Sequence, residues 1–298
     1  MRRDFRFLLA CALAFLSPVS KGATHPSMVE VLAASKPGDW RPVDPDNTLY
    51  MELPGGRVVI ELAPQFAPLH VANVKTLARA GYFDGLAVLR VQDNYVSQWG
   101  DPEHLHPIPA GIGNVAPEFD SPLAAAAPFT RLPDGDMYAP EVGFTNGFPV
   151  ARSASLRRSW LAHCYAMVGV GRDLDVESGS GAEMYAVIGH APRQLDRNVA
   201  LVGRVLQGME LLSQLPRGEA EMGFYTKSQH ALPIRSVKLA ADVPEAQRSH
   251  LEVIRTDSAA FGELIESRRN RPEEFFKVPA GRIELCNVPI AVRQHRAP

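Results

Sequence analysis

The feature of this sequence that most constrains its fold is a series of short apolar runs separated by turn residues. Val58, Ile60 and Leu62 recur at every second position, and Pro54-Gly55-Gly56 separates them from an earlier run. A period of two is typical of a β-strand and Pro-Gly of a tight turn, so these two runs predict a hairpin. The full series predicts strands at 48–53, 57–62, 87–91, 95–99, 165–170, 184–188, 201–206 and 234–240.

Only two helices interrupt this series, at 68–81 and 208–215. In the first, Val71, Val74 and Ala78 recur at helical spacing between a proline at the start and a glycine at the end. A doubly wound sheet would need a helix after nearly every strand. The pattern therefore predicts a mainly β fold, and we expect a closed antiparallel β-barrel with two capping helices.

Three further segments fall outside this series. The stretch at about 102–159, between two of the predicted strands, is too long for an ordinary connection. In the last segment, apolar residues recur at helical spacing over 258–269, and we expect a strand at 283–289. We predict an irregular lead-in at 24–47, a barrel over 48–240 with a long surface insertion at about 102–159, and a C-terminal α/β extension over 241–298 that is an appendage rather than a second domain.

Residues 1–23 have the layout of a cleavable export signal. Arg2, Arg3 and Arg6 precede ten apolar residues at 7–16, and small residues follow. Ten residues are fewer than the roughly 18 needed to cross a bilayer, so no membrane span is expected. We predict an exported, periplasmic protein. A lipid-anchored form through Cys11 is the alternative.

Composition limits the classes of partner. Hydrophobic residues make up 46% of the chain, which is ample for a large core. The formal net charge is −2, which argues against electrostatic binding of nucleic acid. We expect a monomer that does not bind nucleic acid.

Cys164 and Cys286 are the two cysteines left once the signal is removed. An exported protein meets an oxidising compartment, where paired cysteines form disulfides. The alternative is two buried thiols, and the sequence does not choose between them. A disulfide would tie the C-terminal extension to the main body.

Two ordered blocks of residues resemble the cyclophilin family of peptidyl-prolyl cis-trans isomerases. The first reads G-Y-F-D-G at 81–85, V-L-R-V at 88–91 and Y-V-S-Q-W-G-D at 95–101, where the family has G-Y-Y-D-G, F-H-R-V and F-M-x-Q-G-G-D. The second reads G-A-E-M-Y at 181–185, L-D at 195–196 and V-G-R-V-L-Q-G-M at 202–209, similar to G-S-Q-F-F, L-D and F-G-x-V-x-x-G-M. The resemblance spans about 48–240 and implies a cyclophilin-like barrel that isomerises X-Pro bonds. The substrates that it implies are proline-containing polypeptides, here other exported proteins whose folding is assisted.

The chemistry of that reaction is rotation about an amide. Lone-pair donation from nitrogen into the carbonyl gives a barrier of roughly 20 kcal/mol. No covalent bond breaks, so neither a cofactor nor a metal is expected. A catalyst needs an apolar socket for proline, a grip on the flanking backbone and a cation for the twisted state. The guanidinium of Arg90 suits that state, because it is always charged and offers a rigid fork of donors.

The resemblance also implies roles for individual residues. Arg90 takes the place of the catalytic arginine, and Gln98 that of a glutamine that grips the peptide backbone. Gly169 offers an extended peptide only its backbone N–H and C=O. The expected substrate-binding residues are Tyr95, Val96, Gln98, Gly169, Glu183, Tyr185 and Leu195.

Several positions depart from the family pattern. Glu183 replaces a glutamine and either orients Arg90 or competes with substrate for it. Gly169 stands where the family has Asn, and Val199 where it has His or Tyr. These departures motivate a rival prediction, a catalytically weak or inactive module that binds peptides as a chaperone. A structural envelope protein is a third.

Three histidines are also candidate metal ligands. The groups His104-Leu105-His106 and His163-Cys164 contain residue types that bind zinc, but zinc needs three or four converging ligands. Nothing in the sequence fixes such convergence. We interpret them as solvated loop histidines.

Overall fold

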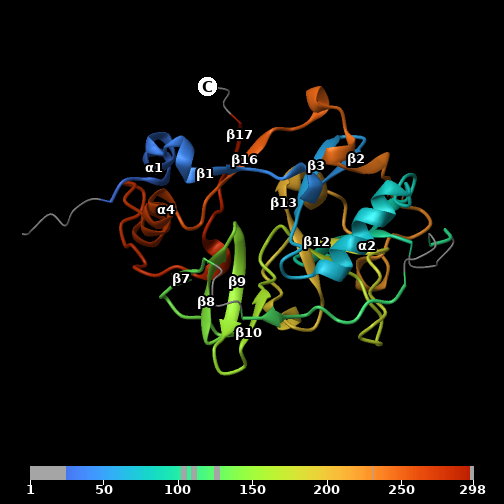
Figure 1. Cartoon of the computed structure of the whole chain (residues 1–298), viewed down its shortest axis with the longest axis horizontal. Coiled ribbons are helices and arrows are strands. Elements are labelled where there is room, and N and C mark those ends of the chain that lie inside the picture. Colours follow the sequence, from blue (N-terminus) through green and yellow to red (C-terminus); the bar gives the residue numbers. More distant parts are fainter. Residues whose placement is uncertain (1–24, 102–105, 109–112, 124–127, 230, 296–298) are drawn as a thin grey trace, which may run out of the picture.

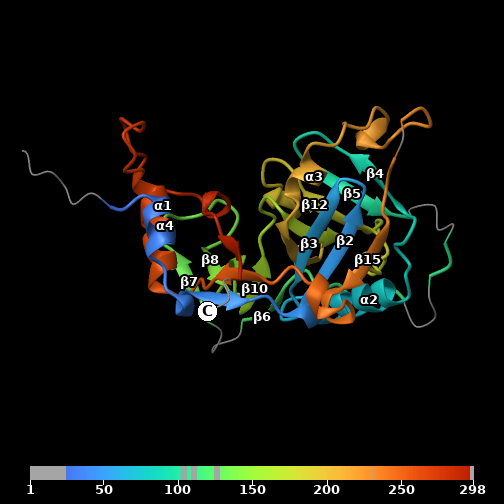
Figure 2. The same cartoon turned by 90° about the horizontal axis from the view of Figure 1, so that it is seen from above.

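The computed structural model describes residues 25–101, 106–108, 113–123, 128–229 and 231–295, which form two lobes side by side (Figures 1 and 2). The predicted export signal, Cys11 and His104 lie outside the described residues. Each lobe has its own large hydrophobic cluster. None of the described helices is long and apolar enough to cross a membrane.

The first lobe is a nine-stranded antiparallel sheet with the order β14-β4-β5-β12-β11-β13-β3-β2-β15. The Pro-Gly turn joins its first two strands, as predicted, with Leu53 paired to Gly56. Every predicted strand is present, and one short strand at 232–233 was not predicted. The strands are β2 (Thr48–Leu53), β3 (Gly56–Leu62), β4 (Ala87–Val91), β5 (Val96–Gly100), β11 (Met167–Val170), β12 (Met184–Val187), β13 (Leu201–Gln207), β14 (Leu232–Pro233) and β15 (Ser236–Leu239).

This sheet curls until its two edge strands, β14 and β15, belong to one continuous segment of the chain. Only Ile234 and Arg235 separate β14 from β15. The Ile234 N–H donates to the Leu86 carbonyl (2.7 Å), and the Arg235 N–H donates to the Glu52 carbonyl (2.8 Å) on β2. The predicted mainly β fold is confirmed. Because the strand ladder is interrupted at these two residues, we describe a curled sheet rather than a strictly closed barrel.

Two helices cover this sheet, as predicted. They are α2 (Pro68–Arg79) and α3 (Met209–Ser213). The apolar face of α2, including Val74 and Leu77, is fully buried in the same hydrophobic cluster as Leu212 of α3. The capping helices therefore close the core against which the strands pack.

The second lobe is built from three distant parts of the chain. Its core contains Val31 from the lead-in, Phe144 from the insertion and Phe261 from the C-terminal extension. One sheet has the order β6-β10-β9-β8-β7 and another the order β1-β16-β17. Its elements are α1 (Met28–Ala34), β1 (Trp40–Pro42), β6 (Ser121–Pro122), β7 (Thr130–Leu132), β8 (Glu141–Thr145), β9 (Phe148–Ser153), β10 (Arg158–Leu161), β16 (Leu251–Ile254), α4 (Ala259–Asn270) and β17 (Val292–Gln294).

Several expectations for these segments are wrong. The lead-in is not irregular, because it contains α1 and β1. The insertion is not mere surface chain: its strands β8 and β9 are buried along almost their whole length. Such strands lack the alternation by which a half-buried strand is found in a sequence. The helix expected at 258–269 is confirmed as α4, whereas no strand forms at 283–289, where the chain makes a 3-10 helix.

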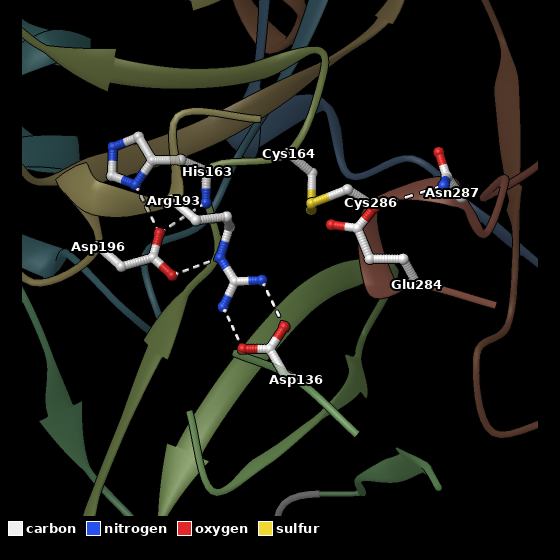
Figure 3. Close-up of a disulfide and its surroundings, with 8 residues drawn as sticks. All are labelled: Asp136, His163, Cys164, Arg193, Asp196, Glu284, Cys286 and Asn287. Carbon is white, nitrogen blue, oxygen red and sulfur yellow. Dashed lines mark hydrogen bonds and ion pairs between the residues drawn. A yellow bond between two sulfur atoms is a disulfide. The ribbon is translucent and has the colours of Figure 1, made fainter. Parts of the chain in front are cut away.

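Short 3-10 helices join many of these elements. Within the described residues they are η1 (Pro37–Asp39), η2 (Pro45–Asn47), η3 (Arg193–Leu195), η4 (Glu221–Gly223), η5 (Ala240–Asp242), η6 (Glu245–Gln247) and η7 (Leu285–Asn287). Cys286 of η7 forms a disulfide with Cys164, their Cα atoms being 5.0 Å apart (Figure 3). The disulfide joins the end of the C-terminal extension to the chain just before β11.

Candidate active site

Arg90 lies on β4, and its guanidinium is held from three directions. Nη1 donates to Gln98 Oε1 (2.9 Å), Nε donates to the Met222 carbonyl (2.7 Å), and Nη2 donates to Gln92 Oε1. These three acceptors are neutral oxygens, so they orient the guanidinium without neutralising it. Burial lowers the pKa of Arg90, but an arginine stays protonated at any physiological pH.

The local strand geometry explains why Arg90 faces outward. The register between β4 and β5 shifts between Val88 and Arg90, which is an irregularity of the β-bulge type. A bulge re-aims the side chains that follow it. Val88 and Val91 are fully buried in the core of the first lobe, whereas Arg90 is half-buried and turned toward the surface.

A groove of about 820 Å³ opens beside this guanidinium. Its wall is apolar: Val96 and Tyr185 form a buried cluster against which Tyr95 and Val199 pack. The Tyr95 ring centroid lies 5.7 Å from Arg90 Cζ. Seven of the eight residues that the sequence singled out line this one groove, namely Arg90, Tyr95, Val96, Gln98, Glu183, Tyr185 and Leu195.

Glu183 is linked to Arg90 through Gln98. Its Oε2 accepts from Gln98 Nε2 (2.8 Å), and Gln98 Oε1 accepts from Arg90. Since the amide nitrogen must face the carboxylate, the amide oxygen is directed at the guanidinium. Of the two effects expected for Glu183, this geometry supports orientation of Arg90.

Gly169 is the eighth residue, and it does not line the groove. It lies on β11, which pairs with β12 on one side and β13 on the other. A Cβ built on Gly169 would come within 2.3 Å of both Cζ and the hydroxyl oxygen of Tyr185. Contrary to our expectation of backbone pairing with a peptide, the geometry indicates that Gly169 makes room for the Tyr185 ring.

Sequence reasoning missed two other parts of the groove. Met222 and Phe224, beyond the second matched block, cover Arg90 from one side, with the Phe224 ring centroid 5.3 Å from Arg90 Cζ. Gly171 and several residues of the loop 172–180 also line the groove, and Leu174 on this loop is 99% exposed. The sequence carries no periodic signal in either segment, so only their closeness to the matched blocks could have suggested them.

The interpretation of His163 as a solvated histidine is wrong. Its side chain is completely buried, and its Nδ1 lies 2.9 Å from Asp196 Oδ1. The neighbouring Cys164 is held in the disulfide. Within the part of the chain that the structure describes, no group of three or more His, Cys, Asp or Glu side chains is placed to hold a metal ion.

Comparison with known proteins identifies the family. A family model described as "Cyclophilin type peptidyl-prolyl cis-trans isomerase/CLD" matches residues 48–239. The chain belongs to the cyclophilin family of peptidyl-prolyl cis-trans isomerases. The match covers the curled sheet with its helices and supports the isomerase activity that the sequence motifs implied.

Individual cyclophilin relatives agree with this assignment. A probable peptidyl-prolyl cis-trans isomerase of Brucella suis is 28% identical over 181 residues, or 60% of this chain and 77% of the relative. The human peptidyl-prolyl cis-trans isomerase-like 1 is 26% identical over 72% of this chain and 99% of its own length. The crystal structure of cyclophilin AquaCyp293 from Hirschia baltica superposes with a TM-score of 0.71 and 27% identity, covering 90% of this chain and 98% of that one. That structural match extends beyond the family domain into the second lobe.

Proposed function

We propose that this cyclophilin family member catalyses rotation about X-Pro bonds in other exported proteins and so assists their folding. One observation carries the proposal: the oriented guanidinium of Arg90 and the apolar wall of Val96 and Tyr185 lie in a single open groove. A proline ring seated against that wall would bring its imide nitrogen toward Arg90. The groove thus supplies a socket and a cation, two of the three groups that the reaction needs.

The proposed mechanism is stabilisation of the twisted amide. When the X-Pro bond is half rotated, the nitrogen lone pair is no longer shared with the carbonyl and becomes a hydrogen-bond acceptor. Arg90 donates to that lone pair, and Gln98 and Met222 hold the guanidinium so that little reorganisation is needed during rotation. Because the planar ground state lacks this acceptor, the interaction favours the transition state selectively.

Two features support action outside the cytoplasm. The layout of residues 1–23 is that of an export signal, and the Cys164–Cys286 disulfide suits an oxidising compartment. The clients we propose are therefore proline-containing segments of periplasmic proteins. Cell fractionation with sequencing of the mature N-terminus tests this location: an unprocessed cytoplasmic chain would contradict it.

Replacement of Arg90 tests the mechanism. In Arg90→Ala we expect kcat/KM for a short X-Pro peptide to fall by about 100-fold or more, because a preorganised donor to the transition state is lost. Arg90→Lys retains the charge without the fork and is expected to lie between the two. Arg172→Ala is the matched control: Arg172 also lines the groove, but its guanidinium donates to the Asn198 and Asp173 carbonyls. Equal activity of Arg90→Ala and wild type would refute the mechanism.

The same measurement separates the enzyme from the rival peptide-binding module. Gln98 donates one of its two amide N–H groups to Glu183, so one possible contact to a peptide backbone is engaged within the protein. That observation favours weak catalysis. Peptide binding by wild type with no acceleration of isomerisation would establish the rival, whereas acceleration of about 100-fold or more that depends on Arg90 would establish the enzyme.

A further inference from the structure

A buried chain of polar side chains runs from the second lobe to Tyr185 in the wall of the groove, and Figure 3 shows the part of it from Asp136 to His163. The Asp136 carboxylate accepts from Arg193 Nη1 (2.8 Å) and Nη2 (3.1 Å). Arg193 Nε donates to Asp196 Oδ2 (2.6 Å), while Asp196 Oδ1 lies 2.9 Å from His163 Nδ1. His163 Nε2 in turn lies 3.0 Å from the hydroxyl of Tyr185. Asp136 belongs to the insertion, between β7 and β8, whereas Tyr185 lies on β12.

The direction of each hydrogen bond follows from its partner. A carboxylate can only accept, so His163 Nδ1 carries the proton that faces Asp196. Burial lowers the pKa of His163 and raises that of Tyr185, which leaves His163 Nε2 unprotonated and the Tyr185 hydroxyl intact. The Tyr185 hydroxyl therefore donates to His163 Nε2.

This hydrogen bond fixes the ring that forms the apolar wall. Tyr185 is 6% exposed, and its ring is stacked nearly parallel to that of His163, with an angle of 11° between the two ring planes. Gly169 leaves the space that the ring occupies. Tyr185 lines the groove, while its hydroxyl is bonded to the buried His163. A shift of His163 would therefore move the Tyr185 ring, against which we propose that proline packs.

We propose that His163 is a positioning residue for the proline socket and that Asp136 of the second lobe sets its place through Arg193 and Asp196. The second lobe then contributes to substrate binding although none of its side chains touches the substrate. This inference rests on the proposed function, since it assigns the support of the same groove.

Single and double variants test the link between His163 and Tyr185. Tyr185→Phe removes only the hydroxyl, and His163→Phe removes the acceptor. Each is expected to raise KM by about 10-fold with little change in kcat, because a misplaced wall weakens the ground and transition states alike. The double variant should be no worse than either single one. His163→Gln, whose amide oxygen can still accept, should stay within about 2-fold of wild type.

Two results would overturn the proposal. One is an unchanged KM in Tyr185→Phe, which loses one oxygen and needs no repacking. The other is a double variant whose KM increase is the product of the two single increases. Folding of each variant is checked by its near-ultraviolet circular dichroism.

The contribution of the second lobe has its own matched pair of variants. Asp136→Asn weakens the paired hydrogen bonds to Arg193 and is expected to raise KM about 3-fold. Glu61→Gln breaks another ion pair between the lobes, in which Arg41 of β1 bonds to the buried Glu61 of β3 (2.6 Å). Two strands separate β3 from β12, which carries Tyr185, in the sheet order. Glu61→Gln should lower the unfolding temperature but leave KM unchanged. Equal effects of both variants on KM would show that general loosening, not this chain of contacts, is responsible.

Measurement of the equilibrium Kd for an X-Pro peptide distinguishes the proposed isomerase activity from the proposed role of His163. If wild type binds the peptide without accelerating its isomerisation, the proposed function fails. The ratio of peptide Kd values for wild type and Tyr185→Phe still decides whether His163 supports the socket.

Discussion

Gly169 shows how one missing side chain shapes the candidate site. The family pattern has Asn at this position, and the sequence alone indicated only a lost peptide-gripping group. In the folded chain, the space above Gly169 is filled by the Tyr185 ring, which is anchored by its bond to His163. The residue is therefore explained by its neighbour across the β11–β12 pair, a relation that the spacing of the motifs does not reveal.

Gly169→Ala is expected to weaken both peptide binding and the fold. The added methyl would overlap the Tyr185 ring, which cannot rotate away while it is buried, and such overpacking costs about 1–3 kcal/mol. Gly179→Ala is the control, because its Cβ would make an ordinary 3.4 Å contact with Val170. Chemical denaturation and the KM for an X-Pro peptide check the prediction. Equal stability of the two variants would contradict it.

The burial of His163 should also make the free energy of unfolding depend on pH. Burial holds its pKa below the ordinary value, although Asp196 opposes this, while Arg193 adds to the lowering and Tyr185 faces the ring as a neutral donor. An unfolded histidine takes up a proton as the pH falls through about 6.5, whereas the folded one does not. The free energy of unfolding should therefore be highest above that pH and decrease below it.

Comparison with His163→Gln isolates this contribution. Between about pH 7.5 and about pH 5.5, wild type should lose up to roughly 1.4 kcal/mol more than the variant, which cannot titrate at this position. Thermal unfolding of both proteins at the two pH values gives the difference. Identical losses would mean that His163 is protonated in the folded protein.

At the scale of elements, α2 begins without a cap of its own. Its N-cap residue is Ala67, but the N–H groups of Leu69 and His70 donate to the Glu118 carboxylate (3.0 and 2.9 Å). A carboxylate at a helix N-terminus satisfies donors that lack a partner and complements the helix dipole. Residue 118 belongs to the predicted insertion, so the insertion stabilises the first lobe as well as building the second.

Removal of this distant cap should be measurable. Glu118→Ala is expected to lower the free energy of unfolding by about 1–2 kcal/mol. At the other end of the same helix, Asp242→Asn removes only an exposed ion pair with Arg79 and should change it by less than about 0.5 kcal/mol. Urea denaturation measures both. A change no larger in Glu118→Ala than in Asp242→Asn would show that the helix is capped by other groups.

The strands differ in how well the sequence predicts them. In β3, the turn residues before Gly56 and the alternation of Val58, Ile60 and Leu62 predict the strand closely. In β9, five of six residues are buried, and nothing alternates. Apolar residues such as Val31 do not reveal which distant segment of the chain will pack against them. The matched motifs likewise predicted seven residues of the groove, but not Met222 or Phe224, which reach Arg90 only through the fold.

At the scale of the whole molecule, the second lobe depends on chain segments that are far apart. Its core needs the lead-in, the insertion and the C-terminal extension together. Because these segments are separated in the sequence, no local pattern predicts that they form one core, and the C-terminal extension was therefore predicted to be an appendage. Joining such segments requires long loops to close, and closure loses chain entropy. The Cys164–Cys286 disulfide closes one of the longest, spanning 122 positions.

Reduction of this disulfide should therefore lower stability substantially. In the chain-entropy treatment, a loop of this length gives a stabilisation of roughly 5 kcal/mol, which corresponds to a fall of roughly 10 °C in the unfolding temperature on reduction. The measurement is thermal unfolding of the mature protein with and without dithiothreitol. The double variant Cys164→Ser with Cys286→Ser should unfold at the lower temperature and should not respond to the reductant. Because His163 precedes Cys164 directly, the reduced protein should also show a raised KM for an X-Pro peptide. An unfolding temperature that is the same in both buffers would mean that packing of the second lobe alone holds the extension in place.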